Sequence, residues 1–296
     1  MVKGLPVQKN AIYAALFSPC DENEGLDEKA LRNLVRHELA HGIEGFYCCG
    51  SSGEGLLLEE SERERVVEIV SEEAAGRVPF IVHTGSLSTR EAIRLSQHAQ
   101  EHGAAAVSMI PPIYYHYRPD EVEGYYEDVV HNVDLGVIVY NIPQFTGISF
   151  SKENRLMADK RIIGIKHTSM NLYDLERMSQ AFPDKVLFNG FDEIWLYAQV
   201  AGATATIGTT CNICPRLYAA VRDAYHAGDL TKAMALQHLV NDFVENLVKA
   251  SIFPAAKYCL ELQGVFIGGC RHPFKPLDEE GKERVRQALT NVKEFL

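Results

Sequence analysis

The sequence lacks several features that mark common protein classes. No apolar run approaches the roughly 18 residues that a membrane-spanning helix needs. No stretch is rich in Lys and Arg, and the net charge of −11 argues against nucleic-acid binding. The first 25 residues lack the long apolar region and the small-residue cleavage site of a signal peptide. We therefore expect a cytoplasmic protein that has neither a membrane nor a nucleic acid as its partner.

Metal and redox motifs are also sparse. The seven cysteines are an odd number in a chain of 296 residues, which favours a reduced compartment over a disulfide framework. Cys211 and Cys214 have the CxxC spacing, but no second CxxC and no His pair lies near them. We interpret these two cysteines as structural, with zinc or redox chemistry as the alternative. The eleven histidines form no HxH or HExxH pattern, and we expect structural roles for His83 and His167.

Short apolar runs alternate with amphipathic segments along most of the chain. Segments 27–42 and 59–76 have the apolar spacing of helices, and the second begins with acidic residues and ends at Gly76. Parallel neighbouring strands require crossover helices, so this alternation predicts a parallel sheet. Eight strand–helix units in about 225 residues predict a closed (β/α)₈ TIM barrel of the α/β class. The predicted strands cover residues 11–16, 45–48, 80–83, 105–110, 137–140, 162–165, 186–188 and 204–207.

The last part of the chain has a different pattern. Residues 226–296 show helical periodicity and no strand pattern. Gly, Pro and Ser do not cluster into a flexible linker at any point. We therefore predict a barrel over residues 1–225, which carries the active site, and a C-terminal helical extension over residues 226–296 that packs on the barrel.

Unusual polar residues follow the predicted strands. In a TIM barrel the active site lies at the carboxyl ends of the strands. Six segments place polar residues there, namely GSSGEG (50–55), PPIYYHY (111–117), Tyr140 before NIP, Lys166, NGFDE (189–193) and GTTCN (208–212). Six segments from different parts of the chain thus predict one active site.

Lys166 is the residue whose position most needs an explanation. It follows a buried apolar run, so its ammonium either reaches solvent or a carboxylate, or is desolvated with a lowered pKa. An uncharged amine attacks a ketone to form a Schiff base, which accepts the electron pair of a breaking carbon–carbon bond and requires no metal or soluble cofactor. Tyr140 ends the neighbouring strand and is the candidate to move a proton, with further hydroxyls on Ser51, Ser52 and Tyr114.

Two segments are candidates for substrate binding. The glycine spacing GxxGxG of GSSGEG is the reverse of a dinucleotide-binding loop, and its small residues suit backbone N–H groups and the Ser51 and Ser52 hydroxyls to a carboxylate. Asp192 and Glu193 have two interpretations. They either cap a helix and match its dipole, or accept hydrogen bonds from a polyhydroxyl chain. The second interpretation places the neutral end of a substrate at NGFDE and its anionic end at the serines.

The motifs GSSGEG, YNIP, GIKHTS and FNGFDE, in this order and at these separations, resemble the pyruvate-dependent class I lyases, the family of dihydrodipicolinate synthase and N-acetylneuraminate lyase. The resemblance covers essentially the whole chain, including CRHPFKPLDEE near its end. It implies that Lys166 forms the Schiff base, that Tyr140 transfers the proton, and that Ser51 and Ser52 bind a pyruvoyl carboxylate. It also implies a homotetramer in which Tyr114 reaches the site of a neighbouring subunit.

Within that family, NGFDE resembles the loop of members that cleave N-acetylneuraminate. QFTGISF, which follows YNIP, lacks the arginine that synthases place there to hold a second carboxylate. The resemblance therefore implies reversible cleavage of N-acetylneuraminate to N-acetylmannosamine and pyruvate. The residues that it places against the rest of the sugar acid are Thr168, Gly190, Asp192, Glu193, Gly208 and Thr209. Two alternatives stay open: a lyase, hydratase or synthase for another 2-keto acid, such as a deoxy sugar acid, and a non-catalytic barrel that senses a keto acid.

Overall fold

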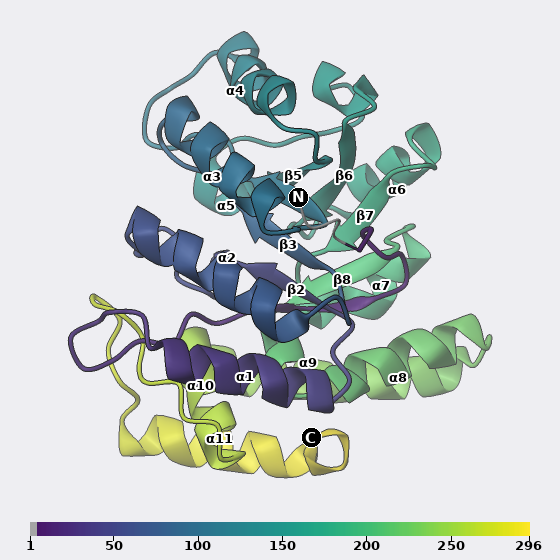
Figure 1. Ribbon diagram of the computed structural model, residues 1–296. Helices are drawn as coiled ribbons and strands as arrows, with labels where there is room; N and C mark the ends of the chain where they lie inside the picture. Colours follow the sequence, from purple (N-terminus) through teal and green to yellow (C-terminus); the bar gives the residue numbers. More distant parts are fainter. Residues whose placement is uncertain (1–4) are drawn as a thin grey trace.

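A computed structural model describes residues 5–296 of the chain (Figure 1). Eight parallel strands form a closed barrel in chain order, in which the last strand pairs with the first. The strands are β1 (Ile12–Ala15), β2 (Gly45–Cys48), β3 (Phe80–His83), β4 (Ala106–Met109), β5 (Val137–Asn141), β6 (Ile162–His167), β7 (Val186–Asn189) and β8 (Ala205–Gly208). The predicted TIM barrel is confirmed, and each predicted run overlaps one strand.

The inside of the barrel is a packed core. Successive side chains of a strand point to opposite faces, so every second residue points inward. The inward cluster includes Tyr13, Tyr47, Ile138 and Phe188, each at most 1% exposed. Gly45 makes room for this cluster, because a Cβ at that position would lie 2.2 Å from the Tyr13 ring. Since the interior is filled, space for a ligand is left only beyond the ends of the strands.

Helices surround the barrel as an outer ring (Figure 1). Their apolar faces pack on the outward side chains of the strands in a second, larger cluster. Predicted segments 27–42 and 59–76 correspond to the first two helices. The helices are α1 (Glu28–Ala40), α2 (Glu60–Ala74), α3 (Thr89–Glu101), α4 (Pro119–Asn132), α5 (Pro143–Thr146), α6 (Leu172–Ala181), α7 (Trp195–Val200), α8 (Pro215–His226), α9 (Leu230–Lys249), α10 (Ile252–Leu262) and α11 (Glu279–Asn291).

Local sequence signals fix the ends of these helices. The Asp27 carboxylate accepts a hydrogen bond from the backbone N–H of Ala30 at 2.9 Å and so caps α1. Such a cap stabilises a helix by about 1 kcal/mol. At the C-terminal end of α2, Ala75 and Gly76 both have positive φ angles, of 46° and 71°. Two consecutive left-handed residues stop the helix next to the glycine that the sequence predicts as its end.

The C-terminal helices α9, α10 and α11 form the predicted extension, and α9 is fastened to the loop after β7. The side-chain oxygen of Gln237 in α9 accepts the N–H of Leu196 at 2.8 Å. Its amide nitrogen donates to the backbone oxygen of Asp192 at 3.3 Å. The extension therefore contacts a segment that also carries candidate site residues. The division of the chain at residue 225 itself stays a prediction.

Further sequence-based expectations concern helices and thiols. No helix within residues 5–296 is long and apolar enough to cross a membrane. All seven cysteines are free in this part of the chain, and only Cys270 is partly exposed. Cys211 and Cys214 belong to the outer apolar cluster. Both thiols therefore contribute to core packing.

Glu38 of α1 is a buried acid without a partner. Its side chain is 1% exposed, and neither carboxylate oxygen has a hydrogen-bond partner among the described residues. Burial raises the pKa of Glu38 well above its usual value of 4.5. Because an unpaired charge is costly in an apolar environment, the folded protein holds this carboxyl in its neutral form.

We expect Glu38→Leu to stabilise the protein, and to do so more strongly as the pH rises. The pKa of Glu38 is higher in the folded protein than in the unfolded chain. Its contribution to the free energy of unfolding is therefore complete below the pKa of the unfolded chain and is lost as the pH rises through the pKa of the folded protein. Leucine has no such loss. Thermal unfolding of both proteins at about pH 5 and about pH 8 measures the difference, and each kcal/mol corresponds to about 2–4 °C in Tm.

Glu28→Leu is the matched control for this prediction. Glu28 lies on the same helix, and its hydrogen bond with Arg65 lowers its pKa. A lowered folded pKa has the opposite sign, so this variant gains no stability as the pH rises. An equal Tm difference at both pH values for Glu38→Leu would contradict a neutral buried acid.

Candidate active site

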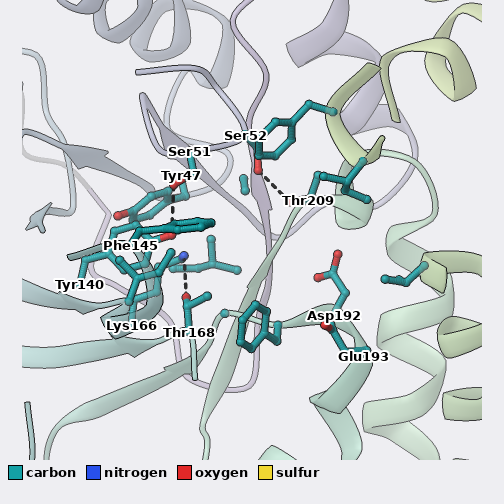
Figure 2. A pocket seen from close by; sticks show the side chains of 18 of the residues that line it. Tyr47, Ser51, Ser52, Tyr140, Phe145, Lys166, Thr168, Asp192, Glu193 and Thr209 are labelled. Atoms are coloured by element: carbon teal, nitrogen blue, oxygen red, sulfur yellow. Dashed lines mark hydrogen bonds between the residues drawn. The ribbon is translucent and has the colours of Figure 1, made fainter. Parts of the chain in front are cut away.

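Tyr140 and Lys166 lie side by side at the carboxyl end of the barrel. They are direct register partners of β5 and β6, which continue to Asn141 and His167. The Lys166 Nζ lies 3.6 Å from the centroid of the Tyr140 ring (Figure 2). The predicted strand 162–165 is two residues too short. The lysine is part of the strand ladder, which fixes its backbone next to that of the tyrosine.

Lys166 is buried, with 4% of its surface exposed. Desolvation lowers its pKa, and the neighbouring Tyr140 and Asp192 only partly oppose this effect. The Nζ donates a hydrogen bond to Thr168 Oγ1 at 3.1 Å (Figure 2). An amine with a lowered pKa is more often uncharged near neutral pH and can act as a nucleophile.

The Tyr140 phenol is placed to exchange a proton. Burial acts to raise its pKa, but the neighbouring Lys166 and hydrogen bonds, among them one with Ser51, outweigh burial and lower the pKa. The Ser51 and Tyr140 hydroxyls share a hydrogen bond of 3.4 Å (Figure 2). The two hydroxyls and the amine thus form one connected group in which a proton can move.

Ser51 and Ser52 lie in the turn after β2. The Ser52 hydroxyl shares a hydrogen bond of 2.8 Å with that of Thr209, which follows β8 (Figure 2). The glycines of GSSGEG let this turn pack closely on the backbone, since a Cβ on Gly55 would lie 1.8 Å from a carbonyl oxygen. The turn therefore places two hydroxyls opposite the amine at the end of the barrel.

The capping interpretation of Asp192 is wrong. Asp192 is the first residue of a short 3₁₀ helix (Asp192–Ile194) whose N-cap is Phe191, so its side chain does not cap that helix. Its Oδ2 instead accepts hydrogen bonds from the Thr210 backbone N–H at 2.9 Å and from the Thr210 hydroxyl at 2.7 Å. Its Oδ1 has no partner among the described residues. Burial raises the pKa of Asp192, although Thr210 and Lys166 oppose the shift. Burial also raises the pKa of Glu193.

Gly190 and Gly208 make room for other site residues. A Cβ on Gly190 would lie 1.9 Å from Thr168 Oγ1, which is the acceptor of the Lys166 hydrogen bond. A Cβ on Gly208 would lie 1.9 Å from the unpartnered oxygen of Asp192. Both glycines are needed for the close approach of functional side chains. Contact of either glycine with a substrate stays a prediction.

These side chains surround one cavity at the end of the barrel (Figure 2). Its volume is about 200 Å³, and it opens to solvent at its mouth. Gly208 lies next to Asp192 but does not line the cavity. Tyr114 does not line the cavity either. The sequence-predicted residues that line the cavity are Ser51, Ser52, Tyr140, Lys166, Thr168, Gly190, Asp192, Glu193 and Thr209.

The sequence analysis missed Tyr47, an inward-facing residue of β2. Its ring lies 5.3 Å from the Lys166 Nζ and meets the Tyr140 ring edge to face. Its hydroxyl donates to Ser108 at 3.0 Å, and burial raises its pKa well above the usual value, so it stays neutral. The alternation of strand residues already indicates that Tyr47 points inward, because it lies two residues after Gly45.

Other lining residues come from the C-terminal helices, which strand-end reasoning does not cover, and from the segments after β5 and β7. Four apolar residues of the C-terminal helices α9 and α10 form one wall of the cavity. Residues of the segments after β5 and β7 add to it. The missed residues include Val244, Val248, Ile252 and Phe253 from α9 and α10, Gln144 and Phe145 from α5, and Ile142 and Phe191 from the loops.

The two histidines at strand ends take no place on the cavity wall. His83 accepts the Ile110 backbone N–H at 3.3 Å, and burial lowers its pKa far below the usual value. His167 bridges the Asn141 side chain and the Asn171 backbone oxygen, each at 3.0 Å. Both contacts are structural, in line with the prediction.

Tyr114 is 85% exposed and has a φ angle of 84°. A positive φ is uncommon for a bulky residue. Its ring meets that of Tyr115 edge to face at 5.0 Å, and neither ring is buried. Its predicted role in a neighbouring subunit stays a prediction.

The chain is similar along nearly its whole length to proteins of known name. The N-acetylneuraminate lyase of Rhizobium meliloti is 39% identical over 282 residues, which are 95% of this chain and 94% of that protein. CdNal from Clostridium difficile, solved in complex with mannosamine, is 32% identical with a TM-score of 0.93, covering 98% of this chain and all of that one. A catalytic lysine mutant of the Ruminococcus gnavus sialic acid aldolase is 27% identical with a TM-score of 0.93, covering 97% and 98% of the two chains.

The model of the dihydrodipicolinate synthetase family matches residues 8–292. This range includes all eight strands, the Tyr140–Lys166 pair and the C-terminal helices that close the cavity. With the barrel, the buried amine and the full-length relatives in agreement, the chain belongs to the dihydrodipicolinate synthetase family.

Proposed function

We propose that the protein is an N-acetylneuraminate lyase, a carbon–carbon lyase that reversibly cleaves N-acetylneuraminate to N-acetylmannosamine and pyruvate. The observation that carries the proposal is the buried Lys166 amine 3.6 Å from the Tyr140 ring in an open cavity. The names of the relatives support the substrate, since they are N-acetylneuraminate lyases and sialic acid aldolases, one of which has a catalytic lysine.

The lining of the cavity suits a sugar acid with one carboxylate. Among the described residues that line it, Lys166 is the only Lys or Arg side chain, so no guanidinium is available for a second carboxylate. The Ser51 and Ser52 hydroxyls bind the carboxylate next to the ketone. At the other end, Asp192 Oδ1 and Glu193 accept hydrogen bonds from the polyol tail, where a second anion would be repelled.

The reaction begins at the ketone of the open-chain sugar acid. Lys166 Nζ attacks C2, and loss of water gives an imine that is protonated at nitrogen. Tyr140 removes the proton of the C4 hydroxyl, the C3–C4 bond breaks, and C4 becomes the aldehyde carbon of N-acetylmannosamine. The electron pair of the broken bond moves through C3 and C2 to the imine nitrogen, which gives an enamine.

The second half of the reaction returns the enzyme to its starting state. The enamine takes at C3 the proton that Tyr140 removed from the C4 hydroxyl, which gives the imine of pyruvate and restores Tyr140. Water adds to C2 of this imine, and the Lys166 amine leaves as pyruvate is released. The imine nitrogen accepts the electrons in this mechanism, so the proposed reaction requires neither a metal ion nor a soluble cofactor.

The proposed assembly is a cytoplasmic homotetramer. The exposed Tyr114 and Tyr115 rings support an interface, because large aromatic side chains are more common at interfaces than on free surfaces. In this assembly the Tyr114 hydroxyl enters the site of a neighbouring copy and joins the proton relay of Tyr140 and Ser51. Seven free thiols support a reducing compartment.

We expect borohydride to trap a pyruvate adduct on Lys166. Reduction of the imine leaves a stable amine, so wild type treated with pyruvate and borohydride gains the mass of one reduced pyruvoyl group. Lys166→Ala gains none and releases no pyruvate from N-acetylneuraminate in a coupled lactate dehydrogenase assay. Lys152→Ala, which removes an exposed lysine, is the control and keeps both properties. Unmodified wild type would contradict the mechanism, and faster pyruvate release from keto-deoxygluconate would change the substrate.

We expect Asp192→Asn to move the acidic limb of the pH profile of kcat/KM to lower pH. The negative charge of Asp192 raises the pKa of Lys166, so its removal lowers that pKa and leaves the amine free at lower pH. The kcat/KM profile reports the pKa of the free enzyme. Glu153→Gln, which removes a 78% exposed carboxylate that does not line the cavity, is the control. If the acidic limb stays in place or moves to higher pH, the charge of Asp192 does not raise the pKa of Lys166.

We expect Tyr114→Phe to lower kcat by about 10²-fold or more, the usual contribution of a proton-transfer group. The ring is retained, so the assembly measured by light scattering is unchanged. Tyr115→Phe removes the neighbouring exposed hydroxyl and retains near wild-type kcat. A monomeric wild type, or a Tyr114→Phe variant of full activity, would speak against a shared site.

A further inference from the structure

Three charged side chains are buried together next to residues 49–55, the turn that carries Ser51 and Ser52 and is called the serine turn below. Glu54 of the GSSGEG motif has a fully buried side chain, and those of Lys257 and Arg271 are 2% and 3% exposed. Charged residues are almost never fully buried unless they are paired. This cluster joins the turn after β2 to α10 and to the segment after α10, which are about 200 residues away in the chain.

The Glu54 carboxylate is held from two sides. The Lys257 Nζ lies 2.6 Å from Glu54 Oε1, and the Arg271 backbone N–H donates to Oε2 at 2.7 Å. The Arg271 guanidinium donates to the backbone oxygens of Ser18 and Glu24 at 3.0 and 3.1 Å. Each charge therefore lies within 3.9 Å of an opposite charge, although Glu54 Oε1 and Arg271 Nη2 form no hydrogen bond of regular geometry among the described residues. These contacts alone do not show whether the cluster also affects the turn that contains Glu54.

The turn that contains Glu54 is strained and carries the site serines. Cys49 and Glu54 lie on either side of the two serines and have positive φ angles of 57° and 53°. Such angles are unfavourable for residues other than glycine and persist only where the surroundings enforce them. The Glu54 backbone N–H donates to the backbone oxygen of Ser51 at 3.1 Å, and Gly55 donates to Gly50 at 3.0 Å. The conformation at Glu54 therefore sets the orientation of Ser51 and Ser52 directly.

The other end of the cluster is connected to the cavity wall. Lys257 lies on α10, whose first residues Ile252 and Phe253 line the cavity. The ion pair thus ties the turn on one side of the cavity to the helix on another. Neither Glu54 nor Lys257 lines the cavity itself.

We propose that Glu54 is a positioning residue, whose ion pair with Lys257 and hydrogen bond from Arg271 hold the serine turn in the orientation that binds the carboxylate of a 2-keto acid. This inference rests on the proposed function. It assigns one shared task to the glutamate of GSSGEG and to the arginine of CRHPFKPLDEE. The serines meet the carboxylate in the ground state and in the transition state alike, so their misplacement weakens binding more than it slows chemistry.

The test uses the full-length protein and two measurements. The pyruvate concentration that gives half-maximal borohydride trapping reports binding of the keto acid without any sugar. The kcat and KM for N-acetylneuraminate separate binding from chemistry. We expect Glu54→Gln to raise the half-saturating pyruvate concentration and the KM by about tenfold or more, while kcat changes by less than about threefold.

Lys257→Met tests the other member of the ion pair and is expected to have the same effect. Lys257→Arg keeps the cation and should lie closer to wild type than Lys257→Met. Because breaking one side of a buried pair costs more than removing both, the double variant Glu54→Gln/Lys257→Met should show less than the sum of the single effects. Glu279→Gln, which removes an 81% exposed carboxylate from the same extension, is the control with unchanged binding.

The outcomes separate this inference from the proposed function. A wild type that traps no pyruvate overturns both. A wild type that traps pyruvate, with folded Glu54→Gln and Lys257→Met variants of unchanged half-saturation, overturns only the positioning role. A loss of kcat at constant KM also overturns it. Thermal unfolding is measured for every variant, and failure of both single variants to fold indicates a structural role instead.

Discussion

The desolvation of one amine is the constraint on which the rest of this structure depends. Lys166 is in the strand ladder of a packed barrel, and its Nζ contacts an aromatic ring and a single hydroxyl. Burial favours the neutral amine, whereas the nearby Tyr140 and Asp192 favour the charged one. The balance leaves an amine of lowered pKa beside a phenol, which is the pair that the proposed mechanism requires.

Small residues around the site matter because they leave room for the functional side chains. Glycines lie next to two of the functional side chains, Gly190 beside Thr168 and Gly208 beside Asp192. The same principle holds in the serine turn, where Gly55 packs on a carbonyl oxygen. A motif of small residues in this protein therefore describes the shape that the backbone must adopt, in addition to any contact with a ligand.

The C-terminal helices complete the site. They supply an apolar wall to the cavity, and α9 contacts the loop of Asp192 through Gln237. The buried Glu54–Lys257 pair connects the same helices to the serine turn. The extension is therefore part of the active-site architecture, which agrees with a family match that runs nearly to the end of the chain.

The sequence by itself determined the eight strands, the surrounding helices and the ends at which polar residues collect. These features follow from local periodicity, and strand ends in a parallel barrel must share one face. Tyr47 was within reach of the same argument, because alternation directs it inward. Only the tertiary structure decided the hydrogen bonds of Asp192, the exact register of Lys166 with Tyr140 and the wall formed by α9 and α10. It also decided the partners of Glu54, since contacts between segments about 200 residues apart leave no periodic trace in the sequence and arise only when the chain closes on itself.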